Sequence, residues 1–240
     1  MNQPVLSFKN VGVCYSRAGR GRKRFWALED ISFDLYAGET LGVIGRNGAG
    51  KTTLMRLMAG IIKPDAGEIH CEVDKVQLLS LQVGFMPDLT GRENAILSGI
   101  LLGMRRREIE AQLNEIIDFA ELHAFIDEPV GTYSSGMKAR LGFAIAKQAD
   151  PDILLVDEVL GVGDVVFREK SRQVMLDKMN AGETVVLVSH MEPVLRQHCK
   201  RVVWIEDGRT RMEGPCEEVL EAYREHMKIQ NKQAIASLRA

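Results

Sequence analysis

The chain has 240 residues, of which 31 are Lys or Arg and 33 are Asp or Glu, so its formal net charge is −2. This near balance gives no overall field that favours nucleic acid or an anionic surface as a partner. Hydrophobic residues make up 45% of the chain, which excludes a disordered protein. The apolar runs are short and the N-terminus has no basic-then-apolar signal sequence, so we expect a cytosolic chain without a membrane span.

The first part of the chain alternates predicted strands, turns and one helix. β-branched and aromatic residues, bounded by turn residues, predict strands at 4–15, as a pair within 25–36, and at 40–44. The strand at 40–44 runs into a glycine-rich loop. Residues 52–60 then predict a helix that ends at Gly60, and a turn follows at 63–67.

From about residue 91 to 149 the apolar period becomes helical, which predicts a helical insertion in an otherwise α/β chain. The apolar stripe that carries this prediction consists of Ile109, Leu113, Ile116 or Ile117, and Ala120. The remaining predicted elements are buried strands at 153–156 and 184–189, a polar helix at 165–180, a hairpin at 202–212 and a helical tail from Glu217.

Residues 45–53 fit the pattern GxxxxGK[ST] without a mismatch, between a predicted strand and a predicted helix. Glycines let the backbone curl so that N–H groups point at phosphates, and the helix N-terminus adds partial positive charge. Lys51 supplies a point charge for the phosphates, and the Thr52 hydroxyl can ligate Mg²⁺. The candidate nucleotide-binding residues here are Gly45, Arg46, Asn47, Gly48, Ala49, Gly50, Lys51, Thr52 and Thr53.

Two acidic residues follow the predicted buried strand 153–156. The carboxyl ends of strands in such a sheet lie beside the phosphate loop, so Asp157 can hold Mg²⁺ directly or through water. The metal does not need the second acid, and Glu158 is placed to orient and polarise the water that attacks the γ-phosphorus. A solvated turn is the alternative interpretation, and a phosphate loop in the same domain favours the catalytic one.

Two further features narrow the class of nucleotide-binding protein. Residues 133–137 read Tyr-Ser-Ser-Gly-Met before a predicted helix at 138–149. Small residues at a helix start can receive phosphate through backbone N–H groups and Ser hydroxyls, although a plain helix cap has the same pattern. His190 follows the strand 184–189, where its imidazole can reach a γ-phosphate; a structural histidine is the alternative.

In their order and spacing these motifs resemble the nucleotide-binding subunit of an ABC transporter, from about residue 5 to 222. The resemblance implies an α/β P-loop NTPase fold with an antiparallel β subdomain and a helical subdomain at about 91–149. The domain would cover 1–222, followed by a short helical tail at 223–240. The implied motifs are Walker A (45–53), the signature (133–137), Walker B (153–158), a D-loop acid (Asp164), a switch histidine (His190) and an aromatic residue that stacks on adenine (Tyr15). Ordinary strand packing is the alternative role of Tyr15.

The resemblance also implies ligands and partners. ATP and Mg²⁺ are held between Walker A of one chain and the signature of a second copy, in a head-to-tail homodimer. Hydrolysis by water, positioned by Glu158 and His190, opens the dimer. The helical subdomain contacts a polytopic permease, of which two copies are expected, so the chain lies peripherally at the cytoplasmic face of the inner membrane. The signature residues that meet ATP are Ser134, Ser135, Gly136 and Met137.

Three segments differ from the usual family pattern and resemble one branch of it. They are Tyr-Ser-Ser-Gly-Met at 133–137, Gly-Phe-Met-Pro-Asp-Leu-Thr-Gly-Arg-Glu-Asn at 84–94, and Val-Asp-Glu-Val-Leu-Gly-Val-Gly-Asp at 156–164. This branch exports polysaccharides such as O-antigen, capsular polysaccharide and teichoic acid. Some of its members carry a further C-terminal carbohydrate-binding domain, for which this chain has no length. We therefore expect the glycan to be selected by the permease or by the nucleotide-binding domain's own surface, and to be contacted mainly by the permease.

Three further features carry predictions of their own. Gln82 falls within about a residue of the family's Q-loop position, where it would be a Mg²⁺ ligand. The basic run 17–24 predicts a solvated loop, or a contact with anionic lipid or the permease. Arg105–Arg107 are candidates for the same contact, and nucleic acid is not expected as a partner.

Alternative functions remain within and outside transport. Another ABC exporter or importer subunit is the nearest. A soluble ABC-type ATPase acting on nucleic acid or ribosomes usually has two cassettes or a long coiled-coil insertion, and neither is evident in this sequence. A P-loop kinase would need an acceptor site and a lid in place of the signature and His190.

Overall fold

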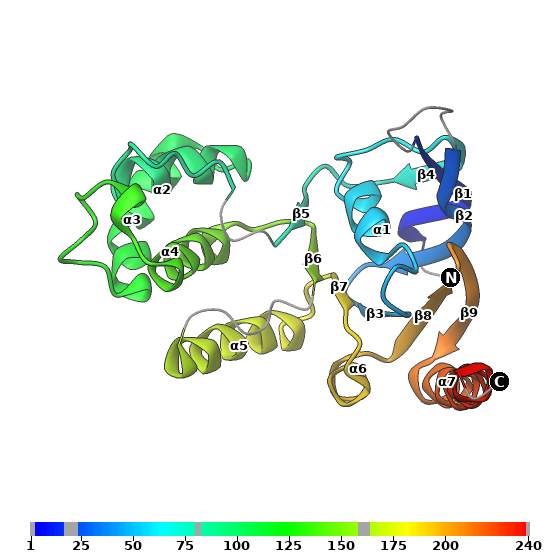
Figure 1. The fold of residues 1–240 in the computed structure, drawn as a ribbon. Coiled ribbons are helices and arrows are strands. Elements are labelled where there is room, and N and C mark those ends of the chain that lie inside the picture. The colour runs from blue at the N-terminus through cyan, green and yellow to red at the C-terminus, as the bar shows by residue number, and fades with distance from the viewer. Residues whose placement is uncertain (1–2, 17–23, 80–82, 158–163, 239–240) are drawn as a thin grey trace. The chain divides into compact units, whose positions relative to one another are not determined.

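The computed structural model describes residues 3–16, 24–79, 83–157 and 164–238. The chain forms two compact units (Figure 1). The first unit consists of Met1–Asp74 and Gly182–Ala240, and the second of Lys75–Ala181.

A mixed sheet forms the first unit, with its described strands in the order β4-β1-β2-β9-β8-β3-β7. Strand β3 lies between β7 and β8 and is parallel to both, whereas β1 pairs antiparallel with β2 and β4. This division confirms the expected α/β fold with an antiparallel β subdomain. The strands are β1 (Pro4–Ser16), β2 (Arg24–Tyr36), β3 (Thr40–Ile44), β4 (Ala66–Cys71), β7 (Val185–Val188), β8 (Arg201–Glu206) and β9 (Arg209–Pro215).

The expectation of two strands within 25–36 is wrong, because β2 is a single strand of 13 residues. It lies antiparallel to β1 over nearly its whole length, and shifts of register let the two strands bend together without reversing. No turn dipeptide interrupts 25–36, and Asp30 also pairs with Arg209 of β9. The long strand therefore depends on partners from both ends of the chain.

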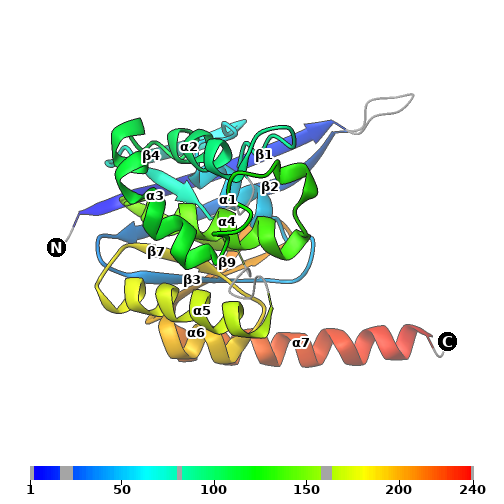
Figure 2. The same ribbon diagram turned by 90° about the vertical axis from the view of Figure 1, so that its left-hand side faces the viewer.

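The helices of the first unit are α1 (Lys51–Met58), α6 (Glu192–His198) and α7 (Cys216–Leu238). Helix α1 buries Leu54, Met55, Leu57 and Met58, and the chain leaves it at Gly60, whose φ of 66° ends the turn as predicted. Helix α6 was not predicted; Pro193 in its first turn is the signal that could have revealed it. Helix α7 is the long helix that runs to the C-terminus in Figure 2.

The second unit holds the expected helical insertion. Its helices are α2 (Gly91–Leu101), α3 (Arg106–Ala120), α4 (Ser135–Gln148) and α5 (Val165–Asn180), with a short 3-10 helix, η1, at Val130–Thr132. Helix α2 begins with a capping box in which Thr90 and Glu93 satisfy each other's backbone N–H groups. Two parallel strands, β5 (Val76–Leu78) and β6 (Ile153–Asp157), complete the unit.

One apolar core holds α2, α3 and α4 together. The α3 stripe predicted from the sequence is buried throughout, and Ile109 and Ile116 are fully inaccessible to solvent. These side chains pack with Leu141, Ala144 and Ile145 of α4 in one cluster. Burial of this stripe explains why an insertion with a strongly charged outer face folds here.

The expected boundary between a domain ending at 222 and a tail at 223–240 falls inside α7, which is continuous across it. Strand β8 and helix α7 belong to the same compact unit. In the part of the chain that the structure describes, no helix combines the length and the apolar character that a bilayer crossing requires.

Candidate functional site

The phosphate loop joins β3 to α1 in the first unit. Gly48 and Gly50 have φ of 84° and 102°, a conformation that favours glycine. The Lys51 ammonium donates to the carbonyl oxygens of Gly45, at 2.7 Å, and Arg46, at 3.0 Å. The Lys51 side chain thus folds back over the loop and bridges two of its carbonyl groups. Thr52 lies in the first turn of α1, where the helix N-terminus carries partial positive charge.

Close backbone contacts explain the glycines at two of these positions. A Cβ on Gly45 would lie 2.3 Å from the carbonyl oxygen of Ile205, in β8. A Cβ on Gly50 would lie 2.6 Å from the carbonyl oxygen of Ala27, in β2. The loop is therefore pressed against two strands, and any side chain at either position would push it out of place.

Tyr15 lies near the end of β1 and is half-buried. Its ring centre is 5.9 Å from that of Phe25, the second residue of β2, with the rings tilted by 38°. Among the described residues, none forms a hydrogen bond with the buried Tyr15 hydroxyl. The strand packing that was the alternative role of Tyr15 is thus present, and stacking on adenine stays a prediction.

The predicted catalytic and metal-binding residues are only partly described. Asp157 is the last residue of β6 in the second unit and is half-buried, whereas His190 follows β7 in the first unit and is exposed. Glu158, Gln82 and most of the basic run 17–24 lie outside the described residues. Their assigned roles stay predictions.

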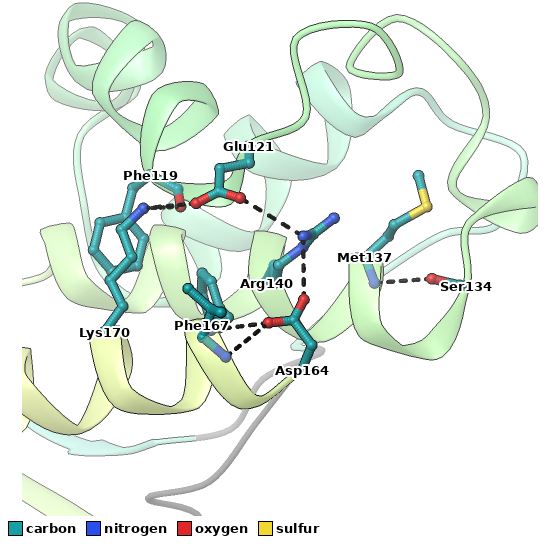
Figure 3. Close-up of polar contacts among 9 residues, drawn as sticks. Phe119, Glu121, Ser134, Met137, Arg140, Asp164, Phe167 and Lys170 are labelled. Carbon is teal, nitrogen blue, oxygen red and sulfur yellow. Dashed lines mark hydrogen bonds and ion pairs between the residues drawn. The ribbon is translucent and has the colours of Figure 1, made fainter.

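The signature segment forms the start of α4 (Figure 3). Ser134 is the N-cap residue, and its hydroxyl accepts a hydrogen bond of 3.2 Å from the Met137 N–H. Ser135 and Gly136 lie in the first helical turn, and Ser134 and Ser135 are exposed to solvent. The segment is thus a capped helix start with small side chains, a form that suits phosphate binding through N–H groups.

A network of charged side chains connects α4 to the start of α5. Asp164 is the N-cap residue of α5 and accepts hydrogen bonds from the N–H groups of Val166, at 3.1 Å, and Phe167, at 3.0 Å. Arg140 of α4 lies 3.7 Å from the Asp164 carboxylate and 3.9 Å from that of Glu121 (Figure 3). The D-loop acid and the signature helix are therefore linked through one arginine.

Lys170 is a second cation of this network and also contacts Glu121. Lys170 of α5 donates to the Glu121 carboxylate at 3.1 Å and to the Phe119 carbonyl at 3.0 Å, and its ammonium lies over the Phe119 ring. Sequence reasoning missed Arg140 and Lys170. Arg140 could have been suspected because it is a lone arginine next to the apolar run 141–146 in α4.

The electrostatic environment of Asp164 favours its charged form. The hydrogen bond from the Phe167 N–H lowers the pKa of Asp164 below its ordinary value, and the positive charge of Arg140 acts in the same direction. Asp164 is therefore ionised at neutral pH, as an N-cap beside an arginine requires.

Comparison with known proteins assigns the family. The model of the family described as ABC transporter matches residues 28–161. An O-antigen export system ATP-binding protein, RfbB of Klebsiella pneumoniae, is 47% identical over 94% of this chain and 99% of its own length. This chain belongs to the ABC transporter family.

Other relatives agree with this assignment. A teichoic acids export ATP-binding protein, TagH of Enterococcus faecalis, is 44% identical over 83% of this chain, which corresponds to 44% of TagH. A solved dimeric ATP-binding cassette in a post-hydrolysis state with ADP and Pi has a TM-score of 0.71, 26% identity, and coverage of 88% of this chain and 98% of its own. The resemblance drawn from the motifs is thereby confirmed, including the polysaccharide-export branch.

Proposed function

We propose that this chain is the ATP-binding and ATP-hydrolysing subunit that powers export of a polysaccharide, a lipid-linked O-antigen or a similar glycan, through a separate membrane permease. The observation that carries the proposal is the 47% identity to an O-antigen export ATP-binding protein over nearly the full length of both chains. The phosphate loop of the first unit and the capped start of α4 in the second support the same activity, because each leads into a helix N-terminus whose backbone N–H groups suit phosphate.

In this proposal the first unit binds ATP through the phosphate loop. Lys51 already lies against two loop carbonyls, so its charge is fixed near the α1 N-terminus, where phosphate oxygens would take their place among its acceptors. The glycines admit the phosphates close to the backbone. Tyr15, held against Phe25, would offer its ring to the adenine.

The proposal includes Mg²⁺, and the residues present suit it. Thr52 in the first turn of α1 and Asp157 at the end of β6 offer hydroxyl and carboxylate oxygens, which are the ligands that Mg²⁺ prefers. Across the described ranges, no three His, Cys, Asp or Glu side chains gather into a metal site made by protein alone. Bound Mg²⁺ would neutralise charge that develops on the phosphates.

Hydrolysis is proposed to need a second copy of the chain. Ser134–Met137 would meet the γ-phosphate of ATP held by the partner copy, and Glu158 and His190 would position the attacking water. The likeness to solved dimeric cassettes supports this arrangement. So does the exposure of Val165 and Val166, which are 77% and 76% accessible to solvent beside Asp164.

The chain is proposed to bind peripherally to the permease at the cytoplasmic face of the inner membrane. The relatives are named as ATP-binding proteins of export systems, which supports a permease as the partner. The helical insertion offers the contact, because the three consecutive arginines at 105–107 are all exposed at the start of α3. The glycan would then be recognised mainly by the permease.

Glu158→Gln is the first test. The substitution keeps the shape of the side chain and removes the charge that polarises water, so we expect ATP hydrolysis to fall by roughly 10²–10⁴ while ATP still binds and holds a dimer. Hydrolysis by the purified chain is measured together with its mass in solution with ATP. Unchanged turnover would remove Glu158 from the catalytic role.

Export is tested in cells that lack the gene. Wild-type protein should restore surface glycan, and Glu158→Gln should not, although both are present at equal amounts. Restoration of a different transported compound with no change in surface glycan would favour another ABC transporter instead.

A further inference from the structure

A polar cluster lies beside the phosphate loop, at the carboxyl end of β8. Strands β3 and β8 are parallel, with Ile44 opposite Trp204, so both strands end at the phosphate loop. The next residues also meet, because Gly45 is packed against the carbonyl of Ile205. Glu206, the last residue of β8, is therefore a close structural neighbour of the loop.

Glu206 is buried, at 7% exposure, and is surrounded by donors. His226 Nε2 lies 2.7 Å from Glu206 Oε1, and Arg211 Nη1 lies 3.2 Å from Oε2. The amide nitrogen of Gln230 donates to Glu206 Oε1 at 3.1 Å. A buried carboxylate is costly unless it is paired in this way, so the two hydrogen bonds to Oε1 and the Arg211 ion pair hold the carboxylate in place.

The amide of Gln230 has only one orientation that satisfies both of its charged neighbours, Glu206 and Arg46. Its nitrogen also lies 2.8 Å from His226 Nε2. A carboxylate only accepts hydrogen bonds and a guanidinium only donates them. The Gln230 nitrogen must therefore face Glu206, and its oxygen accepts from Arg46 Nη1 at 2.5 Å. Gln230 thus connects the buried Glu206 carboxylate to Arg46, the second residue of the phosphate loop.

Helix α7 presents this contact from one face. Tyr223, His226 and Gln230 follow one another at helical spacing, and none of them is fully exposed. The rings of Tyr223 and His226 pack on Trp204, with centroid distances of 5.4 Å and 5.2 Å. This face of α7 therefore packs its rings on Trp204 of β8 and places the Gln230 amide against Arg46.

Arg46 matters to the loop through its main chain. Its carbonyl oxygen accepts from the Ala49 N–H at 3.1 Å and from the Lys51 ammonium at 3.0 Å. A change in the position of Arg46 would consequently alter both the turn and the phosphate-binding lysine.

We infer that Gln230 of helix α7 is a positioning residue for ATP binding, because it fixes Arg46 and thereby preorganises the phosphate loop. The inference rests on the proposed binding of ATP to this loop. By linkage, docking of α7 and binding of ATP favour each other. The long helix is then part of the nucleotide site rather than a separate tail.

The test is a double-mutant cycle on ATP affinity, measured without turnover by displacement of a fluorescent ATP analogue. Gln230→Met keeps the volume of the side chain and removes the amide's hydrogen bonds to Arg46 and Glu206 and its contact with His226, so we expect the Kd for ATP to rise about three- to tenfold. Arg46→Gln should have a similar effect. Gln230→Met should add less than about twofold on top of Arg46→Gln, because both remove one interaction.

Two controls separate positioning from general damage. Gln197→Met makes the same chemical change at an exposed position of α6 and should leave the Kd unchanged. The kcat at saturating ATP should change less than the KM in Gln230→Met. Hydrogen exchange of the backbone amides reports on helix α7 directly. ATP should slow the exchange of amides 223–230 in the wild type, and should slow it less in Arg46→Gln.

The outcomes are distinct. A wild-type Kd in Gln230→Met, or full additivity of the two substitutions, would overturn the inference while ATP binding by the wild type still supports the proposed function. ATP-independent exchange of 223–230 would overturn it as well, even if Gln230→Met folds poorly. Failure of the wild type to bind ATP would overturn the proposed function and this inference with it.

Discussion

Gly50 and Lys51 are adjacent in the phosphate loop, and the structure places opposite requirements on their side chains. Gly50 must lack a side chain because Ala27 fills the space that a Cβ would need, whereas Lys51 must have a long charged one that reaches back over the loop. The motif predicted both residue types from phosphate chemistry. The structure adds the neighbour of Gly50, which lies in β2 and is remote in sequence from the loop, so the motif alone could not name it.

Lys51→Ala should weaken nucleotide binding itself. The substitution removes the point charge for the phosphates and the two hydrogen bonds that close the loop, so we expect the Kd for ATP to rise at least about tenfold. Equilibrium binding of a fluorescent ATP analogue measures it. Lys63→Ala, at an exposed position of the same unit, is the matched control and should bind like the wild type.

The charge of Asp164 predicts how the free energy of unfolding depends on pH. Its pKa is lowered in the folded state, so its charge stabilises the fold above the unfolded pKa and this contribution is lost as pH falls through the folded value. Asn also caps helices but has no charge. The difference in free energy of unfolding between wild type and Asp164→Asn should therefore be largest near neutral pH and shrink below about pH 4. Urea unfolding at several pH values measures it, and a constant difference would contradict the role of the charge.

The elements differ in how far sequence predicts them. The α3 stripe is predicted because Ile109, Leu113 and Ile116 recur at helical spacing and all of them are buried. Helix α5 begins and ends where it was predicted, at Val165–Asn180, since Asp164 is a strong N-cap. Strand β2 was predicted wrongly because its continuity depends on pairing with β1 and β9, which no local pattern encodes.

The core of the helical insertion can be tested at one buried position of α3. Ile116→Ala leaves a cavity in a cluster that α3 shares with α4, so we expect the free energy of unfolding to fall by about 2–5 kcal/mol. Chemical denaturation followed by circular dichroism measures the loss. Ile100→Ala, where the side chain is 47% exposed, makes the same chemical change and should cost much less. Equal losses in the two variants would contradict the assigned core.

At the scale of the whole molecule, function is proposed to depend on partners. The family is shown by the match over 28–161 and by relatives that span nearly the whole chain. The signature and the phosphate loop lie in different compact units of the chain. In the proposed function each supplies one half of an ATP site that a dimer would complete. This division agrees with an ATPase whose cycle is coupled to another protein.

Charge reversal at 105–107 tests coupling to the permease. Arg106 pairs with Glu110 at 2.8 Å within α3, and the side chains of all three arginines remain exposed, so their replacement by Glu should not disturb the core. We expect surface glycan to be lost while ATP hydrolysis by the purified chain is retained. Lys200→Glu, on the exposed turn before β8, is the control. Collapse of the purified ATPase activity would refute a role in coupling alone.

The sequence by itself determined the phosphate loop, the signature, the helical insertion and the family, because each depends on residues that are close together in the chain and on a short-range period or spacing. Only the tertiary structure decided that Arg140 joins Asp164 to Glu121 and that Arg46 meets Gln230. Arg46 and Gln230 are 184 positions apart. Their contact exists because the phosphate loop, which follows β3, and helix α7 both pack against β8. Such a contact follows from how strands are ordered in a sheet, which local patterns do not specify.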